Sequence, residues 1–98
     1  MFSFFPLAKY QIEGHSMLPT LAGEERVLVN RWAKVKPGDI VIIRVEGKDI
    51  VKRLAKITQQ GYFVEGDNKE HSTDSRQFGP VEKKNIIGKV IFRYGPGL

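Results

Sequence analysis

One lysine in the sequence occupies a position where its amine could act as a base. In Ile50–Leu54, the alternation of a β-strand puts Lys52 on the same face as Ile50 and Leu54. If this face is buried, the loss of water favours the neutral amine and lowers the pKa of Lys52. A neutral lysine can take the proton of a serine hydroxyl, as histidine does in other enzymes. If the opposite face is buried instead, Lys52 extends into solvent and has no such role.

A serine that could serve as the nucleophile lies in the segment Gly14–Leu21. Gly14 allows another backbone to approach closely, and Pro19 stiffens the chain shortly after Ser16. The same pattern is also typical of a plain turn, in which the Ser16 hydroxyl bonds to its own backbone. The residues alone therefore offer Ser16 as a nucleophile and leave the turn as an alternative.

Other catalytic or metal-binding groups have little support. The chain has no cysteine, which excludes a thiol nucleophile, disulfides and cysteine-based metal sites. Its two histidines, His15 and His71, are too few for a three-histidine metal site, and we expect both to be solvated loop residues. His15 directly precedes Ser16, so on an extended backbone their side chains point to opposite faces. We therefore expect no Ser–His pair, no metal and no cofactor.

The elements that must position these residues are predicted to be β-strands separated by Gly and Pro turns. They are expected at Arg26–Asn30, Asp39–Val45, Ile50–Ile57, Tyr62–Glu65 and Ile86–Tyr94. Val81–Ile86 fits a single helical turn, and no segment predicts an amphipathic helix of ten residues. The pattern predicts an all-β fold, a small coiled antiparallel β-domain with little helix.

Length and charge limit the remaining function classes. The 98 residues fit one domain, residues 1–98, with an apolar N-terminal extension over residues 1–9. Pro6 interrupts this extension and Lys9 ends it, so we expect membrane contact to be at most peripheral. The net charge of +5 is compatible with nucleic acid, but the lysines are scattered over the loops. We expect no nucleic-acid partner and a cytoplasmic location.

Four segments, in their order along the chain, resemble the motifs of the signal peptidase I family of Ser/Lys peptidases. They are Gly14–Leu21 for the nucleophile, Val35–Ile43 for a core strand, Ile50–Leu54 for the lysine and Gly66–Arg76 for the closing motif. The resemblance extends from about residue 10 to residue 94. It implies the coiled β-fold shared with LexA-type domains, and the activity of a serine endopeptidase.

The resemblance also implies a role for each matching residue. Ser16 is the implied nucleophile, whose amide would stabilise the oxyanion, and Lys52 is the implied general base. Gly14 stands where some family members carry a serine hydroxyl, so this chain would lack that donor. The turn Gly66–Asn68 needs no catalytic role.

Supporting residues and a substrate pocket follow from the same resemblance. The residues expected to aim the lysine and to form an ionic framework around it are Ser72, Asp74, Arg76 and Arg53. Substrate would lie extended between the strand edges near Tyr10–Gly14 and Asp49–Lys52. The residues expected to line its small pocket are Ile12, Leu21 and Val51.

Two departures from full-size signal peptidases suggest a narrower function. We expect no anchoring membrane helix, and only twelve residues, Leu54 to Glu65, link the lysine strand to the next motif. The run Ser72–Pro80 resembles the nickel-type superoxide dismutase maturation proteases, which implies removal of an N-terminal leader from a protein precursor. Alternatives are signal-peptidase-like processing of secretory precursors and a catalytically silent peptide-binding module. A self-cleaving repressor is not expected, because nine residues before Tyr10 leave no room for its other parts.

Overall fold

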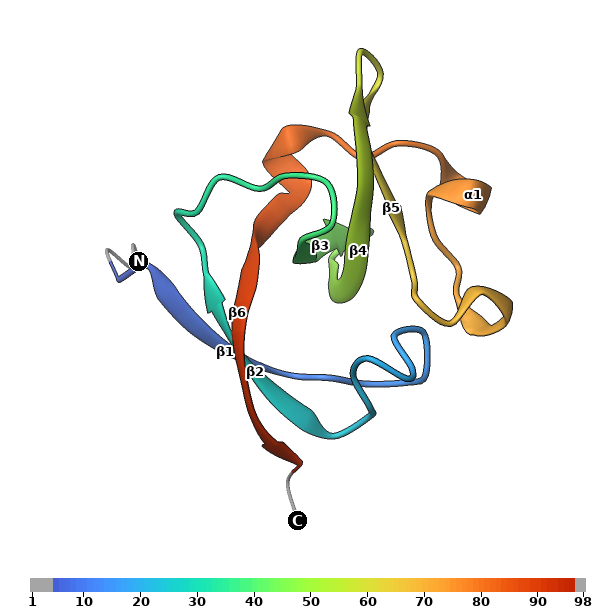
Figure 1. Cartoon of the computed structure of the whole chain (residues 1–98). Coiled ribbons are helices and arrows are strands. Elements are labelled where there is room, and N and C mark those ends of the chain that lie inside the picture. Colours follow the sequence, from blue (N-terminus) through green and yellow to red (C-terminus); the bar gives the residue numbers. More distant parts are fainter. Residues whose placement is uncertain (1–4, 97–98) are drawn as a thin grey trace.

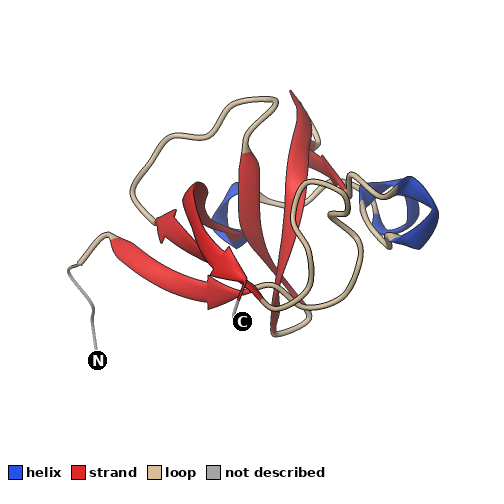
Figure 2. Ribbon diagram, turned by 60° about the horizontal axis from the view of Figure 1, so that its bottom comes forward, coloured by secondary structure: helices blue, strands red, loops and turns tan. Residues whose placement is uncertain are grey.

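A computed structural model describes residues 5–96. The strands within this range are β1 Leu7–Gln11, β2 Glu25–Asn30, β3 Ile40–Val45, β4 Lys48–Thr58, β5 Gly61–Glu65 and β6 Ile86–Pro96. The helical segments are η1 Lys69–His71, α1 Ser75–Phe78 and η2 Lys83–Asn85. Figure 1 shows a strongly curled arrangement of strands, and Figure 2 shows one helical region beside the strands and another behind them. The predicted all-β fold with little helix is confirmed.

The strands form one antiparallel sheet in the order β1-β2-β6-β3-β4-β5. The last strand of the chain, β6, therefore lies between β2 and β3. The loop after β1 belongs to one half of the sheet, and β4 belongs to the other half. Residues far apart in the sequence must meet across this arrangement.

Strand β1 was not predicted. Residues 7–9 were assigned to an apolar extension, yet they pair with β2 through Leu7↔Asn30 and Lys9↔Leu28. The sequence Leu-Ala-Lys-Tyr-Gln contains no β-branched residue, so local propensity does not mark it as a strand, and tertiary pairing decides its conformation. Residues 1–4 of the predicted extension lie outside the described residues. The single helical turn expected within Val81–Ile86 is present as η2.

The core consists of two clusters of buried apolar side chains on opposite faces of β3 and β4. The first contains Ile12, Met17, Leu21, Val27, Val29, Ile42 and Val51. The second contains Val41, Ile43, Leu54, Val64 and Val81. The curled sheet covers both faces of these strands. Successive residues of Ile40–Ile43 are therefore all apolar, instead of alternating between apolar and polar side chains. Lys52 pairs with Val41 and so lies on the side of the second cluster.

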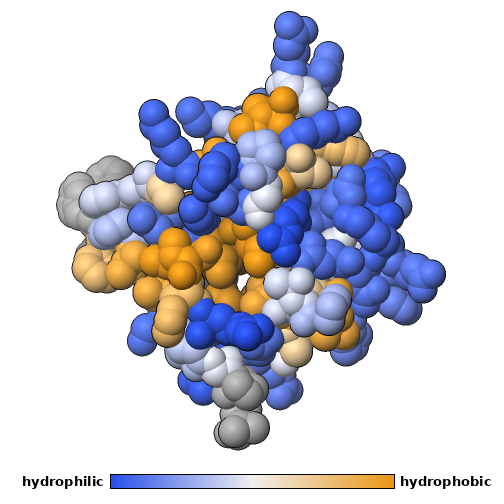
Figure 3. Space-filling view, in the orientation of Figure 1, coloured by the Kyte–Doolittle hydropathy of each residue, from blue (hydrophilic) through white to orange (hydrophobic). Residues whose placement is uncertain are grey.

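The surface is mainly hydrophilic in the view of Figure 3, with an apolar area near the centre of that face. Exposed large apolar side chains of the molecule include Phe5, Trp32 and Phe92. Among residues 5–96, no helix has the length and apolar character that crossing a membrane requires.

Gly88 is predicted to be essential for inserting β6 into the sheet. A Cβ atom there would lie 2.6 Å from Cγ1 of Val29 and 2.8 Å from the carbonyl oxygen of Asn30. Gly88→Ala should therefore lower the free energy of unfolding by about 1–3 kcal/mol, measured by urea denaturation. The exposed change Ile91→Ala on the same strand should cost less than about 0.5 kcal/mol. Equal effects of the two changes would contradict this account.

Candidate active site

The serine lies in the loop between β1 and β2, which is anchored by buried side chains. Met17 is 1 % exposed and Leu21 is 3 % exposed, and the amide of Leu21 donates to the carbonyl of Met17 at 2.9 Å. The amide of Leu18 donates to the carbonyl of His15 at 3.2 Å, so the chain turns tightly around Ser16. The Ser16 side chain remains partly exposed at the surface of this turn.

A second loop, which follows β5, forms hydrogen bonds with the backbone of the serine loop. The amide of Asn68 donates to the carbonyl of Ser16 at 2.8 Å, and its side-chain amide donates to the carbonyl of His15 at 2.9 Å. A Cβ atom on Gly66 would lie 2.5 Å from the Ser16 carbonyl oxygen and would also collide with Ser72. Glycine is therefore required at position 66 by close packing.

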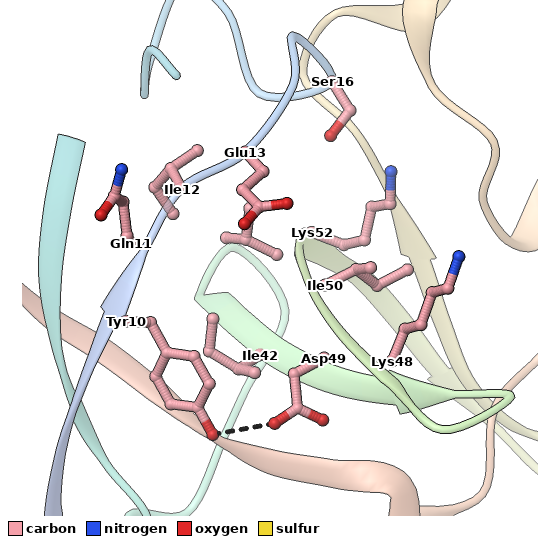
Figure 4. Close-up of a pocket in the computed structure, with 11 residues that line it drawn as sticks. Tyr10, Gln11, Ile12, Glu13, Ser16, Ile42, Lys48, Asp49, Ile50 and Lys52 are labelled. Carbon is pink, nitrogen blue, oxygen red and sulfur yellow. Dashed lines mark hydrogen bonds between the residues drawn. The ribbon is translucent and has the colours of Figure 1, made fainter. Parts of the chain in front are cut away.

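Lys52 is buried beneath the same loop, with 4 % of its surface exposed. Its Nζ atom donates to Oγ of Ser72 at 2.9 Å, and the Ser72 hydroxyl donates to Asp74 at 2.7 Å. Figure 4 shows the Lys52 amine and the Ser16 hydroxyl pointing toward one another at one end of a cavity. Within the described part of the chain, no direct hydrogen bond joins these two groups. The lysine is oriented by Ser72.

The surroundings of Lys52 favour its neutral form. Burial lowers the pKa of Lys52, and the negative charge of Asp74 opposes this effect. The nearby positive charge of Arg76 lowers the pKa further, and the net shift is downward from the ordinary lysine value. These are the conditions under which a lysine can act as a base near neutral pH.

Asp74 is fully buried and remains ionised because it accepts several hydrogen bonds. Its partners are the Ser72 hydroxyl, the amide of Gly66 at 2.8 Å, and the backbone and guanidinium of Arg76. Burial alone raises the pKa of Asp74, but the hydrogen bonds from Arg76, Ser72 and the backbone outweigh it. Its pKa therefore lies well below the usual carboxyl range.

The predicted ionic framework is divided into two separate pairs. Asp74 pairs with Arg76, as the sequence suggested, with Nε 2.9 Å from Oδ1. Arg53, which was expected in the same framework, contacts Asp67, with Nη2 2.6 Å from Oδ2 and Nε 3.1 Å from Oδ1. The resemblance implied no partner for Arg53, because sequence spacing does not tell which acid folds next to it.

Asp67 and Asn68 are the functional-site residues that the sequence analysis missed. Their Gly-Asp-Asn segment was interpreted as a turn without a further role. Asp67 binds Arg53 and also accepts from the hydroxyl of Thr20 at 2.5 Å, while Asn68 binds the serine loop. The opposite charges of Arg53 and Asp67 were the one available signal.

The cavity beside Ser16 and Lys52 has a volume of about 440 Å³. Its lining residues are Tyr10–Glu13, Ser16, Ile42 and Lys48–Lys52. Two of the predicted pocket residues, Ile12 and Val51, are among them. Leu21 is not, because it is buried in the first core cluster behind the wall. At the end away from Ser16, the Tyr10 hydroxyl donates to Asp49 at 3.1 Å (Figure 4).

The backbone around the serine has room for a substrate carbonyl. Gly14 has a φ of 79°, and nothing lies within 4 Å of where its Cβ would be, so no side-chain donor occupies this position. Within residues 5–96, the amide of Ser16 donates no hydrogen bond and is available to an oxyanion. His15 and His71 are both exposed. The described residues contain no group of three or more His, Asp or Glu side chains suited to a metal ion.

Comparisons with known proteins agree with this geometry. The model of the Peptidase S24-like family matches residues 6–91. Signal peptidase IB of Staphylococcus aureus strain N315 is 37 % identical over 76 residues, covering 74 % of this chain and 40 % of that protein. Probable thylakoidal processing peptidase 2, chloroplastic, of Arabidopsis thaliana is 37 % identical over 73 residues, covering 66 % of this chain and 20 % of that protein. The chain thus spans about two fifths of the bacterial relative, and the predicted resemblance to signal peptidases is confirmed.

Lys52 is predicted to reduce stability at neutral pH. Because its pKa is lowered in the folded protein, the unfolded state binds more protons, and stability rises as increasing pH removes them. Lys52→Met should leave stability at neutral pH unchanged or raise it by up to about 2 kcal/mol, with the difference shrinking at alkaline pH. Urea denaturation over this pH range measures both effects.

The exposed change Lys56→Met on the same strand is the matched control and should lower the free energy of unfolding by no more than about 1 kcal/mol, the size of the lost contact between its ammonium and the Phe63 ring. A Lys52→Met protein that is less stable than wild type at every pH would contradict the account. It would indicate a charged lysine stabilised by Asp74.

Proposed function

Because the chain belongs to the Peptidase S24-like family, we propose that it is a serine endopeptidase with Ser16 as nucleophile and Lys52 as general base. The observation that carries the proposal is the buried amine of Lys52, bonded to Ser72 and facing the Ser16 hydroxyl in one cavity. A lysine on a solvated surface would be protonated and unable to accept the serine proton.

The hydrogen bonds leave the lone pair of Lys52 available to Ser16. The single proton of the Ser72 hydroxyl is donated to Asp74, so the Ser72 oxygen must accept from Lys52. A neutral amine has two protons and one lone pair. With one proton directed to Ser72, the lone pair can be directed to the Ser16 hydroxyl.

The reaction then proceeds in two acyl-transfer steps. Lys52 takes the Ser16 proton while Oγ attacks the peptide carbonyl, and the Ser16 amide stabilises the resulting oxyanion. Lys52 donates that proton to the leaving amine, and an ester on Ser16 remains. Lys52 next removes a proton from water, the hydroxide attacks the ester, and the proton returns to Ser16. The carboxyl product is released and the enzyme is restored.

The substrate is proposed to be an extended segment of a protein precursor. It would pair with the backbone at Tyr10–Gly14 and place side chains in the cavity between this segment and β4. The walls formed by Ile12, Ile42 and Val51 favour aliphatic side chains. Cleavage after such residues would remove an N-terminal leader.

A narrower proposal is maturation of nickel-type superoxide dismutase in the cytoplasm. Its support is the resemblance of the run Ser72–Pro80 to the proteases of that branch. Processing of secretory precursors is the alternative that the names of the bacterial and chloroplast relatives favour.

We expect Ser16-dependent cleavage of a peptide pool that contains both substrate types. The pool holds N-terminal precursors of nickel superoxide dismutase and signal-peptide junctions, and mass spectrometry identifies the products. Ser16→Ala and Lys52→Met should each reduce cleavage by at least about 10³-fold, because each removes a reacting group. The control Lys56→Met should cleave at the wild-type rate.

The pool distinguishes the candidate functions. Cleavage of only the dismutase precursors supports the narrower proposal, and cleavage of only the signal-peptide junctions contradicts it. Cleavage that survives in Ser16→Ala rejects the serine mechanism. A folded wild-type protein that binds these peptides without cutting them would be a silent binding module.

The rate of cleavage is also predicted to rise with pH. Lys52 must be neutral to accept a proton, and its lowered pKa brings this form toward neutral pH. Arg76→Gln removes a positive charge that lowers the Lys52 pKa, so the acid side of the kcat/KM profile should move to higher pH. Lys69→Gln, which removes a charge paired with Glu65, is the control and should leave the profile in place. An unmoved profile in Arg76→Gln would contradict Lys52 as the titrating base.

A further inference from the structure

Thr20 lies four residues after Ser16 and is held at two atoms. Its hydroxyl donates to Oδ2 of Asp67 at 2.5 Å. Its carbonyl oxygen accepts from Nη1 of Arg93, on β6, at 2.9 Å. No other side chain of the serine loop, among the described residues, makes a hydrogen bond to the loop that covers Lys52. The Thr20 hydroxyl thus bonds to that loop from the serine side, and the side chain of Asn68 bonds to the His15 carbonyl from the other side.

Asp67 carries this attachment onward to β4. Arg53 contacts both carboxylate oxygens of Asp67, and its Nη1 atom donates to the carbonyl of Gly38 at 2.8 Å. Arg53 directly follows Lys52 in β4. A continuous series of contacts thus runs from the serine loop through Thr20, Asp67 and Arg53 to the strand that carries the base.

The two reacting groups need such a connection. Ser16 is in an irregular loop of the half-sheet that contains β1 and β2, while Lys52 is on β4 in the other half. Asn68 holds the loop at two neighbouring carbonyls, those of His15 and Ser16, and Met17 and Leu21 anchor it in the core. The Thr20 hydroxyl adds an attachment four residues from Ser16, made directly to the carboxylate that Arg53 contacts.

We propose that Thr20 is a positioning residue, which holds Ser16 in line with Lys52 through its hydrogen bond to the Arg53-bound carboxylate of Asp67. The proposal rests on the function proposed above, because its effect is on the serine–lysine geometry. Thr20 does not line the cavity and does not touch a substrate placed there.

Thr20→Val tests the proposal because valine keeps the shape and removes the hydroxyl. Misplacing a reacting group by a fraction of an ångström to 1 Å is costly, so kcat should fall roughly 10- to 100-fold while KM changes less than about twofold. The pH profile should not move, since Asp67 does not contribute to the lowered pKa of Lys52. Thr20→Ser, which keeps the hydroxyl, should restore kcat to within about threefold of wild type.

Thr58→Val is the matched control for lost hydrogen bonding. Thr58 is also partly buried, and in the β4–β5 turn, remote from the cavity, its hydroxyl donates to the carbonyl of Gly61 and accepts from the amide of Gln60. This variant should lose at least as much stability as Thr20→Val and keep wild-type kcat. If Thr58→Val loses as much kcat as Thr20→Val, or if Thr20→Val keeps wild-type kcat, the proposal is overturned.

A mutant cycle tests whether Thr20 acts through Asp67. In an Asp67→Asn background, Thr20→Val should lower kcat by less than about threefold, because the connection is already weakened. If Thr20→Val lowers kcat in this background by the same factor as in the wild-type protein, Thr20 acts by another route and the proposal is overturned.

Amide hydrogen exchange separates failure of this inference from failure of the proposed function. The amide of Asn68 reports the bond to Ser16, and the amide of Leu21 reports the closed serine loop. In Thr20→Val both should exchange at least about fivefold faster, with no change in Thr58→Val. Absence of Ser16-dependent cleavage by the wild-type protein would reject the proposed function. Unchanged amide exchange in Thr20→Val would reject the positioning role of Thr20, whether or not the protein cleaves peptides.

Discussion

The ionised, fully buried carboxylate of Asp74 is the constraint on which the site depends. A carboxylate without water must be surrounded by donors, and here these come from Ser72, Gly66 and Arg76. Collecting those donors folds residues 66–78 over β4, and this cover removes water from Lys52. The same carboxylate thus fixes the direction of the Ser72 hydroxyl and creates the dry surroundings of the amine.

The positions of Asp74 and Arg76 allow a carboxylate to lie near Lys52 without strongly favouring the protonated amine. A carboxylate beside a lysine normally favours the ammonium form, which cannot accept a proton. In this protein Ser72 stands between the two groups, and Arg76 balances the charge of Asp74. The carboxylate therefore orients the amine through a neutral hydroxyl, while its pull on the Lys52 proton is reduced. The function proposed for the protein follows from this separation of orientation and charge.

The sequence predicted the parts of the structure that depend on local pattern. β-Branched and aromatic residues between turn signals marked strands β2 to β6. The resemblance of the motifs implied that Ser16, Lys52, Ser72 and Asp74 belong to one site, and the hydrogen bonds from Lys52 to Ser72 and from Ser72 to Asp74 lie there. The partner of Arg53 was not predictable, because both Asp67 and Asp74 lie within one loop and only its path decides between them. The burial of Leu21 behind the cavity wall, and the role of β1, likewise depend on tertiary packing that periodicity does not encode.

The position of β6 in the sheet has a consequence for how the two parts of the site come together during folding. Among the strands of residues 5–96, β6 alone pairs with both β2 and β3. Without β6, the strand pairings leave β1 and β2 with the serine loop on one side, and β3 to β5 with the lysine on the other. Contacts of such large sequence separation form late and slowly. Docking of β6 therefore joins the half of the sheet that carries Ser16 to the half that carries Lys52, so the relative placement of these two residues depends on pairings between strands far apart in the sequence.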